Sequence, residues 1–106
     1  KIMVQHVGIK RINETGAILE NCEVNFAIII NLLPQVKDNK LLFPWITSVD
    51  PYGDTIFNRT QTPIVVEELK KLKNIINRED IKKEIENVMV FLENSGVHEY
   101  IKFIGD

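Results

Sequence analysis

The stretch TPIVVEELKKLKNIINREDIKKEIENVMVFLENSGVHEYIKFIGD, residues 62–106, decides the fold class, because its hydrophobic period changes from helical to strand-like. Two sets of apolar residues recur at steps of four, three and four positions, which is the spacing of one helix face. The sets are Val65, Leu69, Leu72 and Ile76, followed by Ile81, Ile85, Val88 and Leu92. We therefore predict a helical hairpin whose two apolar faces belong to the core.

Capping residues set the expected limits of these helices. Thr62 followed by Pro63 predicts a helix start, with the threonine as cap and the proline at the first helical position. Asn77 with Asp80 three residues later has the spacing of a capping box for the second helix. Gly96 is a natural cap at the end of that helix.

The end of the stretch alternates between two faces and predicts a strand over residues 98–104. Glu99, Ile101 and Phe103 fall on one face. The other face carries His98, Tyr100, Lys102 and Ile104.

The first half of the chain predicts further strands. Residues 2–12 favour a strand, residues 13–16 a turn, and residues 17–23 a returning strand that completes a hairpin. Asn25 suits the start of a short helix over residues 26–33, ended by Pro34, although the isoleucines within that range are equally typical of a buried strand. Residues 41–49 favour another strand, in which Pro44 implies an edge or a bulge.

The resulting order is strand, strand, short helix, strand, helix, helix, strand. It predicts a single α+β domain over residues 1–106, with an N-terminal β-hairpin, a helical hairpin, a closing strand, and a sheet covered by helices on one face. The last strand could pair with residues 41–49 in either sense. A parallel pairing would bring Asp50, Asp54 and Asp106 to one edge, and an antiparallel pairing would put them at opposite edges.

Composition excludes several classes of function. The 106 residues carry 13 Lys and Arg against 15 Asp and Glu, a net charge of −2, so the chain lacks the basic excess of a nucleic-acid binder. Its longest near-apolar run, residues 26–33, is too short to span a membrane. The single Cys22 cannot form an internal disulfide. We expect a cytoplasmic protein that binds neither nucleic acid nor membrane.

Polar groups concentrate in residues 50–58, DPYGDTIFN, which we call the 50–58 loop. Its first four residues have the chemistry of a type I turn. Candidate binding residues in and near this loop are Asp50, Tyr52, Asp54, Thr55, Asn58, Gln61 and Asp106. Loops at strand ends commonly carry functional groups. The alternative is structural, because Asp, Asn and Thr side chains also brace the backbone of their own turns.

No catalytic residue, metal ligand or cofactor can be assigned. A calcium loop needs more carboxylates than Asp50 and Asp54 and a glutamate where Thr62 stands. Cys22 and His98 could converge in space, but one cysteine and two histidines give such a constellation no specificity. The five glycines are isolated, which excludes a glycine-rich phosphate loop.

The 50–58 loop, with Gln61 and Pro63 after it, resembles the signature of a family of small uncharacterised bacterial proteins, which carry DPYGDTVFN…Q before a helix. The ending of the chain, with Phe103, Gly105 and Asp106, is similar to the closing strand of that family. The resemblance covers residues 41–106, with Ile56 in place of valine. It implies a common fold and no assigned activity.

Three functions are compatible with these observations. The first is a protein-interaction module, immunity- or adaptor-like, that uses the 50–58 loop to bind a basic partner. The alternative is a small enzyme or ligand-binding protein with the Asp50 and Asp54 carboxylates in a cleft. The third is structural, an oligomeric scaffold such as a homodimer, whose open sheet edge or apolar helix face pairs with itself. A chain of this size buries a limited core, and dimerisation is a common supplement.

Overall fold

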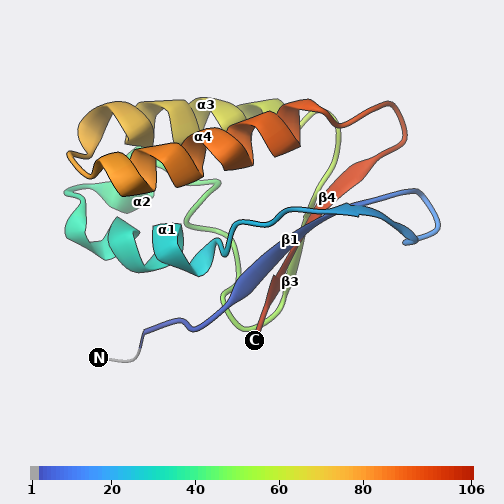
Figure 1. Cartoon of the computed structure of the whole chain (residues 1–106), viewed down its shortest axis with the longest axis horizontal. Coiled ribbons are helices and arrows are strands. Elements are labelled where there is room, and N and C mark those ends of the chain that lie inside the picture. The colour runs from blue at the N-terminus through green and yellow to red at the C-terminus, as the bar shows by residue number, and fades with distance from the viewer. Residues whose placement is uncertain (1–2) are drawn as a thin grey trace.

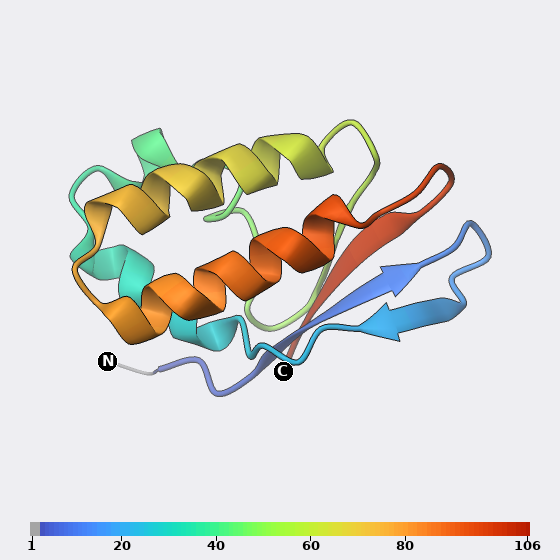
Figure 2. The ribbon, with the colours of Figure 1, turned by 45° about the horizontal axis from the view of Figure 1, so that its top comes forward.

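The computed structural model describes residues 3–106 and has the predicted α+β fold, with helices on one face of a four-stranded antiparallel sheet (Figures 1 and 2). The strand order is β2-β1-β4-β3, so the first and the last strand of the chain lie side by side at the centre of the sheet. The elements are β1 (Val7–Ile12), β2 (Ile18–Asn21), α1 (Ala27–Leu32), the 3-10 helix η1 (Leu33–Gln35), α2 (Asn39–Leu42), β3 (Asp54–Phe57), α3 (Thr62–Ile75), α4 (Glu79–Glu93) and β4 (Tyr100–Gly105).

The predicted N-terminal hairpin is present, with shorter strands than expected. Ile2, at the start of the predicted first strand, lies outside the described residues, and the strand begins at Val7. Asn13 closes the turn, because its Oδ1 accepts hydrogen bonds from the amides of Thr15 and Ala17, both at 3.0 Å. Gly16 has a φ of 88°, a left-handed conformation that glycine adopts without steric cost.

The predicted short helix is also present as α1, and Asn25 holds its first turn. The Oδ1 of Asn25 accepts the amide of Ala27 at 3.0 Å and the amide of Val7 at 3.0 Å. One side chain therefore joins the start of α1 to the start of β1. Pro34 does not end the helical path at once, because it lies inside η1.

The prediction of a strand over residues 41–49 is wrong. This segment contains the end of α2 and then a series of turns. The cause is the carboxylate of Glu68, on α3, which accepts the amides of Trp45 at 3.1 Å and Ile46 at 2.9 Å. Pro44 has no amide to give to a sheet, and the hydroxyl of Thr47 donates to the carbonyl of Phe43. The backbone groups that a strand would need are used within the turns.

The missing strand is formed instead by Asp54–Phe57, which the sequence analysis assigned to the 50–58 loop. β3 pairs antiparallel with β4, and Asp54 lies opposite Ile104. The start of β3 therefore lies beside the end of β4. Asp50, Asp54 and the end of the chain therefore lie at the same end of the sheet. The sequence analysis expected this arrangement only for a parallel pairing, because it placed the strand at residues 41–49, ahead of Asp50.

The helical hairpin is confirmed, and all eight residues of the two predicted apolar sets are buried. The ends of the helices differ from prediction. α4 begins at Glu79 with no side-chain cap, and Asp80 pairs with the guanidinium of Arg78 at 2.8 Å instead of forming a capping box with Asn77. α4 ends at Glu93, ahead of Gly96. No helix in residues 3–106 is long and apolar enough to cross a membrane.

The core lies between the helices and the inner face of the sheet. Three aromatic rings connect the two layers, with Phe103 of β4 at 4.8 Å from Phe26 and 5.7 Å from Phe57 between ring centroids. On β4, Ile101 and Phe103 share one face of the predicted alternation, and both are fully buried. The half-buried ring of Trp45 packs 6.0 Å from Phe57.

Candidate functional site

The 50–58 loop is fastened to the end of β4 by a close backbone contact. The amide of Gly105 donates to the carbonyl of Gly53 at 2.8 Å. A Cβ at position 105 would lie 2.3 Å from the backbone carbonyl of Pro51, which is too close for any side chain. The DPYG turn and the Gly-Asp ending are therefore in direct contact, and glycine at position 105 makes that contact possible.

Two of the candidate side chains brace this loop. The carboxylate of Asp50 accepts the amide of Tyr52 at 2.9 Å, and the hydroxyl of Thr55 accepts the amide of Asp50 at 2.9 Å. Gly53 packs against the same carboxylate, since a Cβ there would lie 2.6 Å from Asp50 Oδ2. The bond between Asp50 and Tyr52 is an Asx-turn interaction, and together these contacts fix the loop. Asp50 and Thr55 thus have the structural role that the sequence analysis gave as the alternative.

Asn58 and Gln61 form a capping box ahead of α3. The Asn58 side chain accepts the amide of Gln61 at 2.9 Å, and the Gln61 side chain accepts the amide of Asn58 at 2.9 Å. The reciprocal bonds satisfy amides that have no partner within the helix. The cap thus lies one turn before the predicted Thr62, whose hydroxyl donates to the carbonyl of Asn58 at 2.9 Å.

Three candidates remain exposed at the end of the sheet. Tyr52 is 61% exposed at the tip of the loop. Asp54 has an exposed carboxylate 3.4 Å from the ammonium of Lys102 on the neighbouring strand. Asp106 is exposed and directly follows Gly105. The structure therefore brings Asp50, Tyr52, Asp54 and Asp106 to one end of β3, while Asn58 and Gln61 lie at its other end.

The two loop carboxylates at this end of the sheet both have partners within the chain. Asp50 is occupied by its own turn, and Asp54 has a lysine partner. Among residues 3–106, no group of three or more His, Cys, Asp or Glu side chains is placed to hold a metal ion. An exposed phenol beside carboxylates can contribute apolar contact area and charged hydrogen bonds to a partner.

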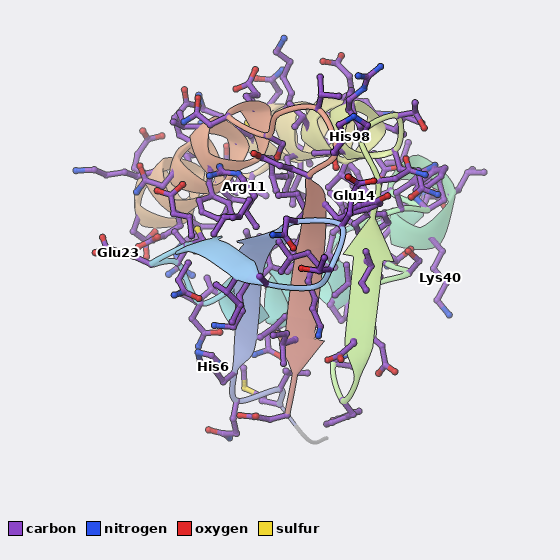
Figure 3. The ribbon with its side chains drawn as sticks, turned by 90° about the vertical axis from the view of Figure 1, so that its right-hand side faces the viewer. His6, Arg11, Glu14, Glu23, Lys40 and His98 are labelled. Carbon is purple, nitrogen blue, oxygen red and sulfur yellow. The ribbon has the colours of Figure 1, made fainter. Side chains whose placement is uncertain are left out.

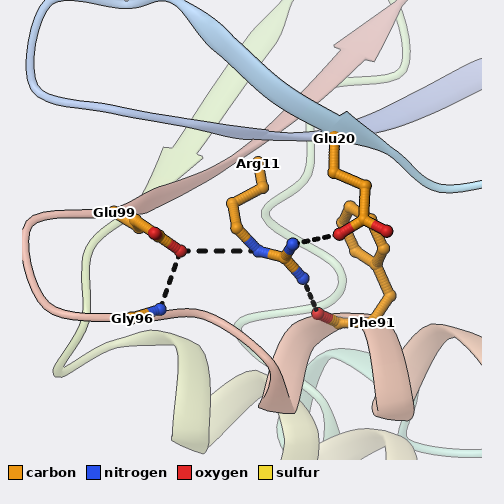
Figure 4. A network of polar contacts seen from close by, with 5 residues as sticks. All are labelled: Arg11, Glu20, Phe91, Gly96 and Glu99. Carbon is orange, nitrogen blue, oxygen red and sulfur yellow. Dashed lines mark hydrogen bonds and ion pairs between the residues drawn. The ribbon is translucent and has the colours of Figure 1, made fainter.

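Sequence analysis missed a charged cluster at the opposite end of the sheet. Figure 4 shows Arg11 of β1, which is 6% exposed, between Glu20 of β2, Glu99 before β4 and the backbone of α4. Its guanidinium donates to the carbonyl of Phe91 at 2.6 Å, forms an ion pair with Glu20, and lies 3.7 Å from Glu99. Its carbon also lies 4.6 Å from the centre of the Phe91 ring.

A signal for this cluster is present in the sequence. Arg11 has the same strand parity as the buried residues Val7 and Ile9, so the alternation places it on the core face. A charged side chain at such a position needs partners. The partners of Arg11 come from three other segments of the chain, so the residues next to Arg11 in the sequence do not reveal which they are.

Cys22 and His98 line different hollows of the surface, Cys22 between β2 and α4 and His98 beside residues 58–60. Burial, together with the negative charges of Glu23, Glu84 and Glu20, raises the pKa of the Cys22 thiol, which opposes formation of the reactive thiolate. His98 lies on the exposed turn before β4, with Nδ1 3.6 Å from the carboxylate of Glu14 (Figure 3).

Comparison with protein-family models, with curated proteins and with solved structures found no match to this chain.

Proposed function

We propose that the chain is a cytoplasmic protein-interaction module, immunity- or adaptor-like, that binds a partner through the end of the sheet formed by the 50–58 loop and Asp106. The carrying observation is the 61% exposure of Tyr52 on a loop held by its own hydrogen bonds and by Gly105. Tyrosine is enriched among residues that dominate binding energy, and a loop fixed before binding loses little entropy.

The flanking charges support a basic partner. Asp54 is exposed at the start of β3 and Asp106 is exposed after the end of β4, so both carboxylates lie at the same end of the sheet as the phenol. Such a rim steers a positively charged surface toward the aromatic centre. The partner is another protein or a second copy of the chain. On the resemblance of residues 41–106, we also propose that the chain is one of the small bacterial proteins with the DPYGDT signature.

The test is a quantitative pulldown from the native cytoplasm with the wild-type chain and Tyr52→Ala. We expect a stoichiometric partner that the variant loses by tenfold or more, since truncating a central aromatic costs about 2 kcal/mol or more. Leu41→Ala is the matched control, because Leu41 is an 80% exposed apolar residue on α2. The proposal fails if no stoichiometric partner is found, or if Tyr52→Ala and Leu41→Ala retain it equally.

A further inference from the structure

The free edge of the sheet at β2 is the second surface with a distinct chemistry. β2 is an edge strand, and all four of its residues, Ile18–Asn21, are exposed. Beyond it the chain continues beside β1, because the amide of Cys22 donates to the carbonyl of Ile9 at 2.9 Å. In an antiparallel pair, residues that bond to the partner strand alternate with residues that do not. Cys22 bonds to Ile9, so the backbone amide and carbonyl of the preceding residue, Asn21, point away from β1. No strand within residues 3–106 covers this outer side.

A groove runs beside this edge, between the strand and α4. Its volume is about 440 Å³, and the helix side presents Asn87, Val90 and Asn94. Val90 is 52% exposed, although it lies on a helix packed against the core. An extended peptide that adds to a sheet edge needs outward backbone groups for hydrogen bonds, which give affinity, and apolar area for its side chains, which gives specificity. The edge of β2 and the neighbouring Val90 provide both.

The charge of this groove is negative. The carboxylates of Glu23, Glu84 and Glu20 all act on the Cys22 thiol in the groove wall. Glu20 is paired with Arg11, which leaves Glu23 and Glu84 as the outer charges. Figure 3 shows Glu23 at the outer margin of the molecule beyond β2. Lys10 is bonded to Asn21 on the other face of the sheet.

We propose that the groove between the free edge of β2 and α4 binds an extended, lysine- or arginine-rich peptide segment of a partner protein, which adds as a fifth strand. A second copy of the chain is disfavoured as the occupant. A two-fold pairing of β2 with itself would bring the same carboxylates together from both copies, and like charges repel. A basic strand removes that repulsion and pairs with the outward backbone groups.

The proposal is independent of the Tyr52 surface. β2 and β3 are opposite edges of the sheet, and the 50–58 loop leads into β3. A partner could therefore occupy either surface without the other. Failure of one proposal leaves the other standing, and the experiment below separates them.

The experiment is a nuclear magnetic resonance titration of the whole chain with capped octapeptides of alternating lysine and valine. We expect saturable shifts of the amides of β2 and of residues 87–94, with an affinity that falls as salt is added. An octapeptide with glutamate in place of lysine should give no shifts. N-methylation of the backbone amides that face β2 should weaken binding about tenfold or more, because each removes a hydrogen-bond donor.

Two variants locate the binding surface. Glu23→Lys should weaken binding about tenfold. Glu67→Lys, at an exposed position of α3, is the control with the same change in net charge. Val90→Lys should also weaken binding, with Ile75→Lys as its control, since Ile75 is a similarly exposed residue on α3. Tyr52→Ala should leave peptide binding unchanged.

Four results would overturn the proposal. The first is an absence of shifts up to about 1 mM peptide, which corresponds to negligible affinity, and the second is equal weakening of binding by Glu67→Lys and Glu23→Lys. The third is a set of shifts that is confined to the 50–58 loop and lost in Tyr52→Ala. The fourth is concentration-dependent protection of the β2 amides without peptide, which would identify a second copy as the occupant.

Discussion

The two ends of the sheet are held in different ways. The 50–58 loop is fixed by hydrogen bonds between residues two to five positions apart, together with one backbone contact to Gly105. The Arg11 cluster joins residues 9 and 80 positions apart through a buried charge. The first end presents the exposed ring of Tyr52 on a loop whose conformation is fixed mainly by hydrogen bonds between nearby residues. The second end connects the hairpin to α4 and depends on the whole fold.

This difference predicts that the Arg11 cluster contributes more to stability than any single contact of the loop. Arg11→Ala should lower the free energy of unfolding by about 3 kcal/mol, because it leaves the Phe91 carbonyl and Glu99 without their partner. Chemical denaturation measures the change. Arg78→Ala removes an exposed guanidinium and is the control, expected to stay near wild type. Equal effects of the two variants would contradict the assignment.

The close contact at Gly105 is the strongest test of the other end. Gly105→Ala should destabilise the chain by about 2 kcal/mol, since the added methyl group collides with the backbone of Pro51 and neither segment can yield by rotating a side chain. Thermal unfolding provides the measurement. Gly8→Ala, on the neighbouring strand, meets only His6 at an ordinary distance of 3.5 Å and should be neutral or slightly stabilising. A neutral Gly105→Ala would show that the loop is not fastened there.

A smaller effect is expected at the capping box. Asn58→Ala should cost about 1 kcal/mol, the usual loss for a helix cap, because the amides of Thr60 and Gln61 lose their acceptor. Asn74→Ala is the control, as Asn74 is exposed in the last turn of the same helix, α3. Denaturant titration of both variants would refute the assignment of Asn58 as the cap if they unfolded at the same midpoint.

The smallest effect concerns the thiol near the Arg11 end. Alkylation of Cys22 requires the thiolate, so the alkylation rate rises with pH as the thiol ionises. Because the pKa of the thiol is raised in the folded chain, the midpoint of this rise should lie at a higher pH than in the urea-unfolded chain. Glu23→Lys should move this midpoint downward, because a positive charge replaces a negative one. Iodoacetamide kinetics followed by mass spectrometry measure both. Identical profiles for the folded and unfolded chain would contradict the shift.

Sequence periodicity predicted the parts of the fold that are set locally. The helical hairpin and β4 follow from residue spacing, and the role of Asp50 and Thr55 in their own turn is one of the two interpretations that the sequence left open. Residues 41–49 were mistaken for a strand because the group that folds them into turns, the Glu68 carboxylate, lies 22 and 23 positions away from the amides it binds. The partners of Arg11 were beyond prediction for the same reason.

The position of β4 has a consequence for how the chain folds. β1 pairs with β4 along its whole length, from Val7 opposite Gly105 to Ile12 opposite Tyr100. During synthesis the hairpin is made first, yet one side of β1 has no partner until residues 100–105 leave the ribosome. Pairing between such distant segments is slow, and an open strand edge can join other chains in the meantime. Completing the centre of the sheet is therefore expected to be the late, rate-limiting event of folding.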